Sequence, residues 1–301
     1  MLKMKLVALM FILLWMAAPA QRSGNLHAQQ PNTPAQSLLW KIEGNDLPAP
    51  SHLFGTIHAI CPDEVVINDA IESAVDTSAQ VALELDLDDQ RLIVELGRLA
   101  FLPGDSTLHD IFSEEEYARL NRWMKDSVGV SIDPMINLRP LWMIGMLVNK
   151  VIGCKSTSYE EMFIAMAQRQ DKEVIGIEQP EEQLSAFSTI PLKEQGRMVL
   201  EIIDHMDSAR AEFRRLADAY TAHDLMKLRE LVLNSSIEYG RYSEELIGKR
   251  NRNWIPRILR AARQKSTFFA VGAGHLPGDD GLISLLRKEG YTVTPVSSNT
   301  E

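Results

Sequence analysis

The sequence predicts an α/β protein with a central mixed sheet and a large helical insertion over about residues 108–265. Two observations predict this class. Six short apolar runs, each bounded by turn-forming residues, have the length and composition of β-strands. Most of the chain between these runs carries apolar residues at helical spacing. Strands that alternate with helices along a chain are typical of a sheet covered by helices.

The first two expected strands form a hairpin. S-L-L-W-K-I-E at 37–43 and S-H-L-F-G-T-I-H at 51–58 are separated by G-N-D-L-P-A-P, which is rich in turn formers. Helical spacing then covers 62–76, and the apolar run V-A-L-E-L-D-L follows it, so this part predicts a strand–helix–strand unit. The remaining expected strands are 172–178, 266–272 and 291–296.

Helical spacing dominates the middle of the chain, from about 110 to 170 and again from Pro180 to about 264. Ser113 and Glu116 have the spacing of a capping box, which marks the start of a helix. The apolar stretch 138–153 also contains Arg139, so it predicts a buried helix rather than a membrane span.

The N-terminus has the layout of a secretory signal peptide over residues 1–20. Two lysines precede an apolar run at 6–18, and A-P-A supplies a small-x-small cleavage site. A membrane anchor is the alternative, but the run is shorter than the ~20 residues that a spanning helix needs. Residues 21–36 are polar with two prolines and predict a flexible tether before the domain at 37–301. We therefore expect a secreted or periplasmic protein without a transmembrane span after signal cleavage.

The composition excludes some partners. Thirty-one basic residues stand against 41 acidic ones, which gives a formal net charge of -10. No dense run of lysine or arginine is present to bind a phosphate backbone, so nucleic acid is not an expected partner.

The chain contains two cysteines, Cys61 and Cys154. An even count in an exported protein permits a disulfide between them. Two separate free thiols are the alternative. A third interpretation is a Cys61 thiolate on a metal, because Cys61 follows His58 by three residues.

Two ordered Gly-x-x-His motifs occur at the ends of expected strands, in L-F-G-T-I-H and A-V-G-A-G-H. The carboxyl ends of parallel strands meet at one edge of a sheet, where ligands of α/β proteins bind. His58 and His275 are therefore expected to be neighbours. Glu84 and Glu178 close two further expected strands, and a buried acid at such a position requires a partner or a cation.

Two imidazoles and a carboxylate form a common ligand set for a catalytic divalent cation. The same atoms could also form a metal-free acid–base pair. The structural alternatives are hydrogen-bonded histidines and a Glu84 that caps a helix or pairs with Arg139. These residue types alone leave all of these interpretations open.

Taken together, the motifs resemble the TraB/GumN family, which includes the Tiki metalloproteases. The resemblance covers about residues 38–296 and depends on the order of several motifs. These are L-F-G-T-I-H, V-A-L-E-L-D, K-E-V-I-G-I-E-Q-P-E-E-Q-L, I-P-L-K-E-Q, K-R-N-R-N-W and V-G-A-G-H-L.

The resemblance implies a fold similar to the EreA/ChaN-like group and a site made of His58, Glu84 and His275. It further implies secondary site residues at Glu178, Arg250 and Asn251. The Tiki branch is regarded as divalent-metal-dependent peptidases. The chain departs from the family in one segment, where many members have Gly-x-Asp and this chain has T-S-Y-E-E-M-F, so either Ser158 or Glu160 could serve there.

The expected function is accordingly a secreted or periplasmic hydrolase that uses one divalent cation, with Mn, Co and Zn as candidates. His58 and His275 would hold the metal, and Glu84 would be a third ligand or a general base. A peptide or protein is the expected substrate. The alternative is a non-catalytic envelope protein that captures a peptide or glycan in the same cleft.

Overall fold

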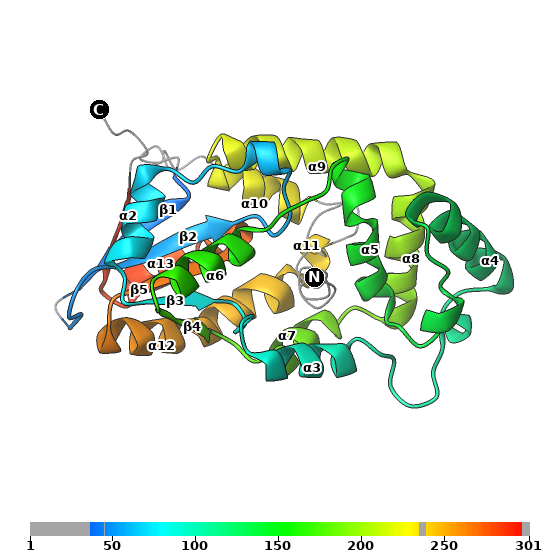
Figure 1. Cartoon of the computed structure of the whole chain (residues 1–301), viewed down its shortest axis with the longest axis horizontal. Coiled ribbons are helices and arrows are strands. Elements are labelled where there is room, and N and C mark those ends of the chain that lie inside the picture. The colour runs from blue at the N-terminus through cyan, green and yellow to red at the C-terminus, as the bar shows by residue number, and fades with distance from the viewer. Residues whose placement is uncertain (1–36, 45, 235–238, 297–301) are drawn as a thin grey trace.

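A six-stranded mixed sheet forms the centre of the molecule (Figure 1). The computed structural model describes residues 37–44, 46–234 and 239–296, so the expected signal peptide and tether lie outside the described residues. The strand order is β4-β3-β5-β2-β1-β6. All six expected strands are present: β1 (Leu39–Glu43), β2 (Ser51–Thr56), β3 (Gln80–Leu83), β4 (Glu173–Gly176), β5 (Thr267–Gly272) and β6 (Thr292–Pro295).

The expected hairpin is confirmed, because β1 and β2 pair antiparallel with Leu39 opposite Phe54. Strands β2, β5, β3 and β4 run parallel, whereas β1 is antiparallel to both of its neighbours. The sheet is therefore mixed, as predicted. The last strand but one in sequence, β5, lies between β2 and β3, so the carboxyl ends of four parallel strands share one edge.

Helices cover the sheet in two layers. α2 (Asp69–Thr77) contacts α6 (Tyr159–Arg169), which packs on β3 and β4. α12 (Lys249–Gln264) contacts β5 and α13 (Leu282–Lys288), which packs on β6. The connection from β4 to β5 runs back across the sheet, so a right-handed crossover places α12 on the face opposite to α2 and α6.

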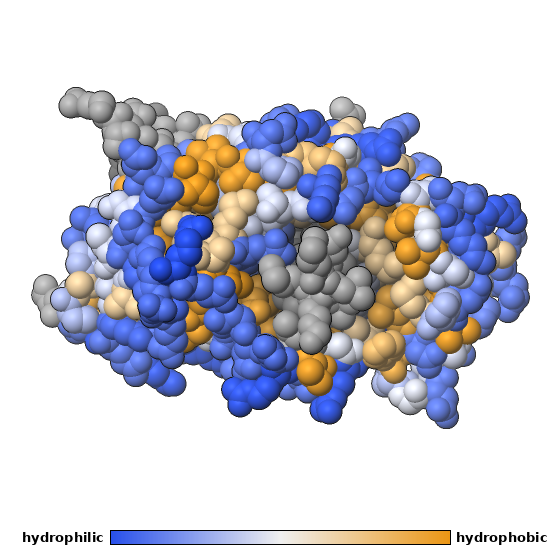
Figure 2. Space-filling model, in the orientation of Figure 1, coloured by the Kyte–Doolittle hydropathy of each residue, from blue (hydrophilic) through white to orange (hydrophobic). Residues whose placement is uncertain are grey.

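The remaining helices include a helical lobe beside the sheet, in which α5 packs against α8 and α9 (Figure 1). These helices come from both sides of β4 in the sequence. They are α3 (Gln90–Leu99), α4 (Glu114–Trp123), α5 (Pro140–Ile152), α7 (Pro180–Phe187), α8 (Leu192–Asp204), α9 (Met206–Thr221), α10 (Leu225–Leu233) and α11 (Tyr239–Ser243). On the face in Figure 2, hydrophilic side chains cover the two ends of the molecule and hydrophobic ones gather toward its middle.

Short 3₁₀-helical and π-helical turns make up the other helical segments of the described residues. They are η2 (Pro62–Glu64), η3 (Leu108–Asp110), η4 (Met124–Val128), η5 (Asp133–Met135), η6 (Glu244–Gly248) and η7 (Ala273–His275).

The sequence sets the ends of the helices locally. The Ser113 hydroxyl accepts a hydrogen bond from the backbone of Glu116, and the Glu116 carboxylate accepts one from the backbone of Ser113, which confirms the capping box. Helix α5 begins with Pro140, where a missing N–H costs nothing, and is capped after Ile152 by Gly153, whose φ of 87° suits glycine. Among the described helices, none combines the length and the apolar character needed to cross a membrane.

Cys61 and Cys154 form a disulfide, with their Cα atoms 5.9 Å apart. The bond ties the segment after β2 to the segment that follows α5. Ile60 and Thr157 pair by an antiparallel bridge close to it. The interpretation of Cys61 as a metal ligand is therefore wrong, because its sulfur is already bonded.

Candidate catalytic site

Four side chains from four adjacent parallel strands meet at the carboxyl edge of the sheet. Glu84 directly follows β3, and His275 ends the turn η7 after β5. His58 and Glu178 each lie two residues beyond the ends of β2 and β4. All four are buried. The strand order β4-β3-β5-β2 explains this meeting of residues that are up to 217 positions apart in sequence.

The Glu84 carboxylate lies between the two imidazoles. Its Oε1 is 3.9 Å from Nε2 of His58 and 4.0 Å from Nε2 of His275, and it accepts a hydrogen bond of 2.8 Å from the backbone N–H of Gly272. Its Oε2 accepts one of 2.7 Å from Arg250. Burial alone would raise the pKa of Glu84, but Arg250 and the two imidazoles outweigh it and lower the pKa to about 2.

His275 is fixed in one tautomer by Asn251. The amide nitrogen of Asn251 donates to the carbonyls of His275 and Asp280, so its Oδ1 must be the acceptor for Nδ1–H of His275 at 2.6 Å. The lone pair on Nε2 then accepts a hydrogen bond of 3.2 Å from Nη1 of Arg250. Burial and the Arg250 charge lower the pKa of His275 to about 3, so the ring is neutral.

His58 is held from the opposite side by Glu160 of α6. Its Nδ1 lies 2.9 Å from Oε1 of Glu160, which also accepts a hydrogen bond of 2.7 Å from the Thr56 hydroxyl. Nδ1 therefore carries a proton, and Nε2 faces Glu84. Burial alone would lower the pKa of His58, but the Glu160 carboxylate raises it above its usual value. Ser158 instead caps α6, because its hydroxyl accepts a hydrogen bond from the backbone of Glu161.

Glu178 anchors the Arg250 guanidinium. Arg250 donates from Nε and Nη2 to the two oxygens of Glu178, at 3.1 and 2.5 Å. Trp254 and Gln183 also donate to this carboxylate, each at 2.9 Å. Burial raises the pKa of Glu178 even though Arg250 opposes this effect. Arg250 and Trp254 lie four positions apart on α12, so one face of that helix supplies both groups.

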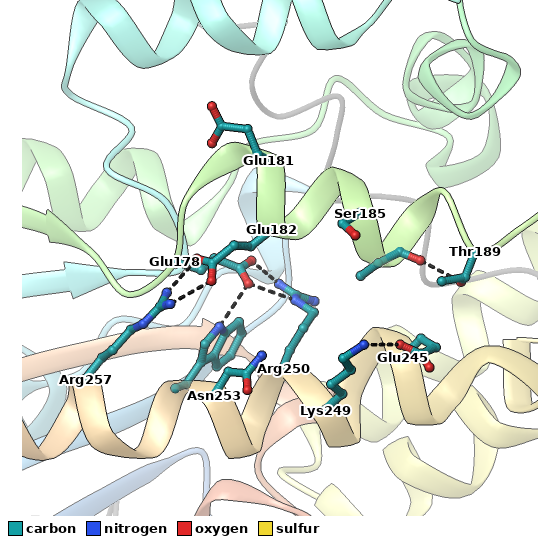
Figure 3. A pocket seen from close by; sticks show the side chains of 12 residues that line it. Glu178, Glu181, Glu182, Ser185, Thr189, Glu245, Lys249, Arg250, Asn253 and Arg257 are labelled. Atoms are coloured by element: carbon teal, nitrogen blue, oxygen red, sulfur yellow. Dashed lines mark hydrogen bonds and ion pairs between the residues drawn. The ribbon is translucent and has the colours of Figure 1, made fainter. Parts of the chain in front are cut away.

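A cavity of about 310 Å³ adjoins this ion pair between α7 and the η6–α12 segment (Figure 3). Glu178, Arg250 and Trp254 form the part of its wall that belongs to the buried site. Two further pairs border it. Arg257 contacts both carboxylate oxygens of Glu182 at 2.6 Å, and Lys249 lies 3.2 Å from Glu245.

The chemical types of the donor atoms suit a divalent cation, since His58 and His275 offer imidazole nitrogens and Glu84 offers a carboxylate. Gly272 keeps space open beside them: a Cβ there would lie 2.9 Å from Nε2 of His58 and 3.3 Å from Oε1 of Glu84. Nevertheless, no group of three His, Cys, Asp or Glu in the described part of the chain is already arranged around one cation position. Arg250 contacts Nε2 of His275 and one oxygen of Glu84.

Other candidates from the sequence lie outside this cluster. Arg139 does not serve as the partner of Glu84. It immediately precedes α5, and its Nε donates to the carbonyl of Leu99 at the end of α3. His109 belongs to η3, where it stacks on Tyr117 and lies 3.4 Å from Glu114.

Sequence reasoning missed three polar residues that complete the site, namely Thr56, Gln183 and Trp254. Thr56 precedes the first Gly-x-x-His histidine by two residues, so it emerges from the same strand end. Gln183 and Trp254 are buried polar positions on helices that also carry apolar core residues. The available signal was a polar group at a helical position that the apolar spacing marks as buried, because a buried hydrogen-bond donor needs an acceptor.

A model described as the TraB/PrgY/gumN family matches residues 38–295. Metalloprotease TIKI1 of Danio rerio is 26% identical over 333 residues, which cover 91% of this chain and 66% of that protein. Metalloprotease TIKI2 of Danio rerio is 28% identical over 316 residues, covering 85% and 60%. Metalloprotease TIKI1 of Homo sapiens is 28% identical over 335 residues, covering 92% and 65%.

The chain thus spans about two-thirds or less of the length of these three relatives. No solved structure matches it. The family model, however, covers nearly all of the described residues, and it includes every motif on which the resemblance depended. The chain belongs to the TraB/PrgY/gumN family.

Proposed function

We propose that this protein is a divalent-metal-dependent hydrolase of the cell envelope or the extracellular space, and that it cleaves peptide bonds. The observation that carries the proposal is the position of Glu84, whose Oε1 faces Nε2 of both His58 and His275 at about equal distance. Each imidazole is held at its other nitrogen by a buried acceptor. Such outer partners orient the ligands of metal sites.

His58, Glu84 and His275 would hold the cation. The cation, when bound, supplies a Lewis acid that polarises a carbonyl and makes water acidic enough to act as a nucleophile near neutral pH. The pKa of Glu84 is lowered to about 2, so this carboxylate is ionised and suits a ligand better than a proton acceptor. Glu160 would keep the Nε2 lone pair of His58 directed at the site, and Asn251 would do the same for Nε2 of His275.

Peptide substrates are proposed by analogy with the relatives named metalloprotease TIKI. The cavity beside Glu178, Arg250 and Trp254 is large enough for a few side-chain groups and adjoins the buried cluster. The disulfide supports action in an oxidising compartment, because such bonds persist in secreted and periplasmic proteins.

The test combines metal titration with digestion of a peptide library. Metal-free protein is titrated with Mn²⁺, Co²⁺ or Zn²⁺ in a calorimeter, and each loaded form is then incubated with the library. His58→Ala and Glu84→Gln should each weaken metal binding by tenfold or more and abolish cleavage. His109→Ala is the matched control and should leave both unchanged, since His109 lies in η3, outside the cluster.

Two outcomes would contradict the proposal. If His58→Ala and Glu84→Gln bind all three metals as tightly as the parent, these residues form no metal centre. If the parent binds metal at this site but cleaves no peptide in the library at any pH, a binding protein that captures a peptide or glycan becomes the better description.

A further inference from the structure

We infer that Arg250 competes with the metal, so that its guanidinium and a divalent cation alternate on Glu84 and His275. The inference rests on the proposed metal site, because it concerns how that site is filled. Arg250 is buried, and it contacts three of the groups in the cluster: Glu84, Glu178 and His275.

The competition follows from the tautomer of His275. Because Nδ1–H of His275 donates a hydrogen bond to Oδ1 of Asn251, the ring has a single lone pair, on Nε2. That lone pair lies 3.2 Å from Nη1 of Arg250, and it can accept this hydrogen bond or bind a metal but cannot do both. Glu84 is less restricted, since Arg250 contacts Oε2 whereas Oε1 faces the imidazoles.

Electrostatics favours the exchange. The Arg250 guanidinium lies between two buried carboxylates, Glu84 and Glu178, so one positive charge serves both. A divalent cation at Glu84 would repel the guanidinium and would leave Glu178 as its carboxylate partner. Each cation would then have its own carboxylate, which is the arrangement that buried charges require.

The structure also provides room for the displaced guanidinium. Arg250 already lines the cavity of about 310 Å³ between α7 and α12, together with Glu178 and Trp254 (Figure 3). Its Cζ already lies over the Trp254 ring, 4.7 Å from the ring centre, so this cation–π contact can continue to support the guanidinium as it turns toward the cavity. If the Arg250 side chain rotated while its guanidinium stayed bound to Glu178, the Arg250–Glu178 ion pair would persist and Glu84 and His275 would be released.

Two variants separate competition from simple support of the fold. In the double variant Arg250→Met, Glu178→Gln the competitor is absent and Glu178 no longer carries a charge that needs it, while Glu84 keeps the hydrogen bond from the backbone N–H of Gly272. In the matched single variant Glu178→Gln the guanidinium remains, and Glu84 becomes its principal carboxylate partner. Competition therefore predicts opposite changes: tighter metal binding in the double variant and weaker binding in the single variant.

The experiment is a calorimetric titration of the purified protein with Co²⁺ and Mn²⁺, with the absorption spectrum of bound Co²⁺ as a second readout. Circular dichroism and thermal unfolding establish that each variant is folded. The Kd of the double variant should fall by roughly tenfold or more, which is the factor that one charge-assisted hydrogen bond contributes. The Kd of Glu178→Gln should rise.

The outcomes distinguish this inference from the proposed function. Arg250 is not a competitor if the parent binds metal and the folded double variant binds it equally or less tightly, and the metal site itself then stands. If neither the parent nor the double variant binds Co²⁺ or Mn²⁺, both the metal site and the competition are overturned. Binding by the double variant alone would be the strongest support for competition.

Discussion

Nδ1 of His58 and Oε1 of Glu160 lie 2.9 Å apart, and this contact joins the end of β2 to the first turn of α6. Both side chains are buried. The Thr56 hydroxyl donates to the same oxygen of Glu160, so the carboxylate is itself oriented. Glu160 therefore fixes the tautomer of His58 and the direction of its other nitrogen, as the outer carboxylate of a metal-bound histidine does.

The first prediction is that Glu160→Gln weakens metal binding by about tenfold to a hundredfold, the range found for outer-shell partners of metal ligands. A glutamine oxygen can still accept a hydrogen bond from Nδ1–H of His58. It lacks the negative charge that makes Nε2 of His58 a stronger ligand. The measurement is the Kd for Co²⁺ by calorimetry, with thermal unfolding to follow stability.

Ser158→Ala is the control for this prediction, since Ser158 caps the same helix through the backbone N–H of Glu161. Loss of the cap should reduce stability by about 1 kcal/mol and leave the Kd unchanged. Equal metal binding by Glu160→Gln and the parent would show that Glu160 does not support the site.

Much of this site could be expected from the sequence, because strand ends are readable from local pattern. The runs that end in His58, Glu84 and His275 are short and apolar, and their parallel pairing brings their ends to one edge. Glu178 was expected from its own strand end, and the family motifs added Arg250 and Asn251. The local pattern could not provide the strand order. β5 inserts between β3 and β2, and its paired residues lie 187 positions from those of β3 and 216 positions from those of β2.

Side chains from helices were harder to predict. Arg250 and Trp254 share a face of α12 with apolar core residues, and periodicity alone identifies that face as buried. It does not say which carboxylate the guanidinium meets. The choice between Ser158 and Glu160 was open for the same reason, since both lie at the start of one helix and only the packing of α6 on the sheet decides which of them reaches His58.

The second prediction concerns the disulfide. Cys61 and Cys154 are 93 residues apart, and closing a loop of this length stabilises the folded state by about 4 to 5 kcal/mol in the chain-entropy model. The double variant Cys61→Ser, Cys154→Ser should lose a large part of this free energy of unfolding, measured by urea denaturation. A reducing agent should destabilise the parent and leave the double variant unaffected. If the parent also proves insensitive to reduction, the bond does not contribute to stability.

The third prediction is a pH dependence of stability that arises from Glu212 in the middle of α9. This side chain is 7% exposed, and its burial raises the pKa from 4.5 to about 8, although Arg215 opposes the effect. The folded state therefore holds a proton that the unfolded state releases near pH 4.5. The contribution of Glu212 is fully present below that pH and is lost as the pH rises toward 8.

Glu212→Gln removes this titration. The variant should gain stability relative to the parent as the pH rises from 5 to 8, measured by urea denaturation at several pH values. Glu115→Gln is the control, because it removes the same charge from an exposed position on α4. A constant difference in stability between Glu212→Gln and the parent across this range would contradict the raised pKa.

The last prediction uses two glycines that lie two residues apart. A Cβ at Gly272 would lie 2.9 Å from Nε2 of His58, closer than real contacts allow, and 3.3 Å from Oε1 of Glu84. A Cβ at Gly274 would meet nothing nearer than the Cδ1 of Ile247 at 3.9 Å. Gly272→Ala should therefore force the buried His58 ring to move, whereas Gly274→Ala should be accommodated.

Overpacking of this kind costs about 1 to 3 kcal/mol of stability. The specific expectation is that Gly272→Ala also weakens metal binding, because the added methyl group occupies the space between His58 and Glu84. The Kd for Co²⁺ and the midpoint of thermal unfolding are measured for both variants. If Gly272→Ala is destabilised yet binds Co²⁺ as tightly as Gly274→Ala, the cation does not use that space, and His58 and Glu84 belong to the structure of the sheet edge alone.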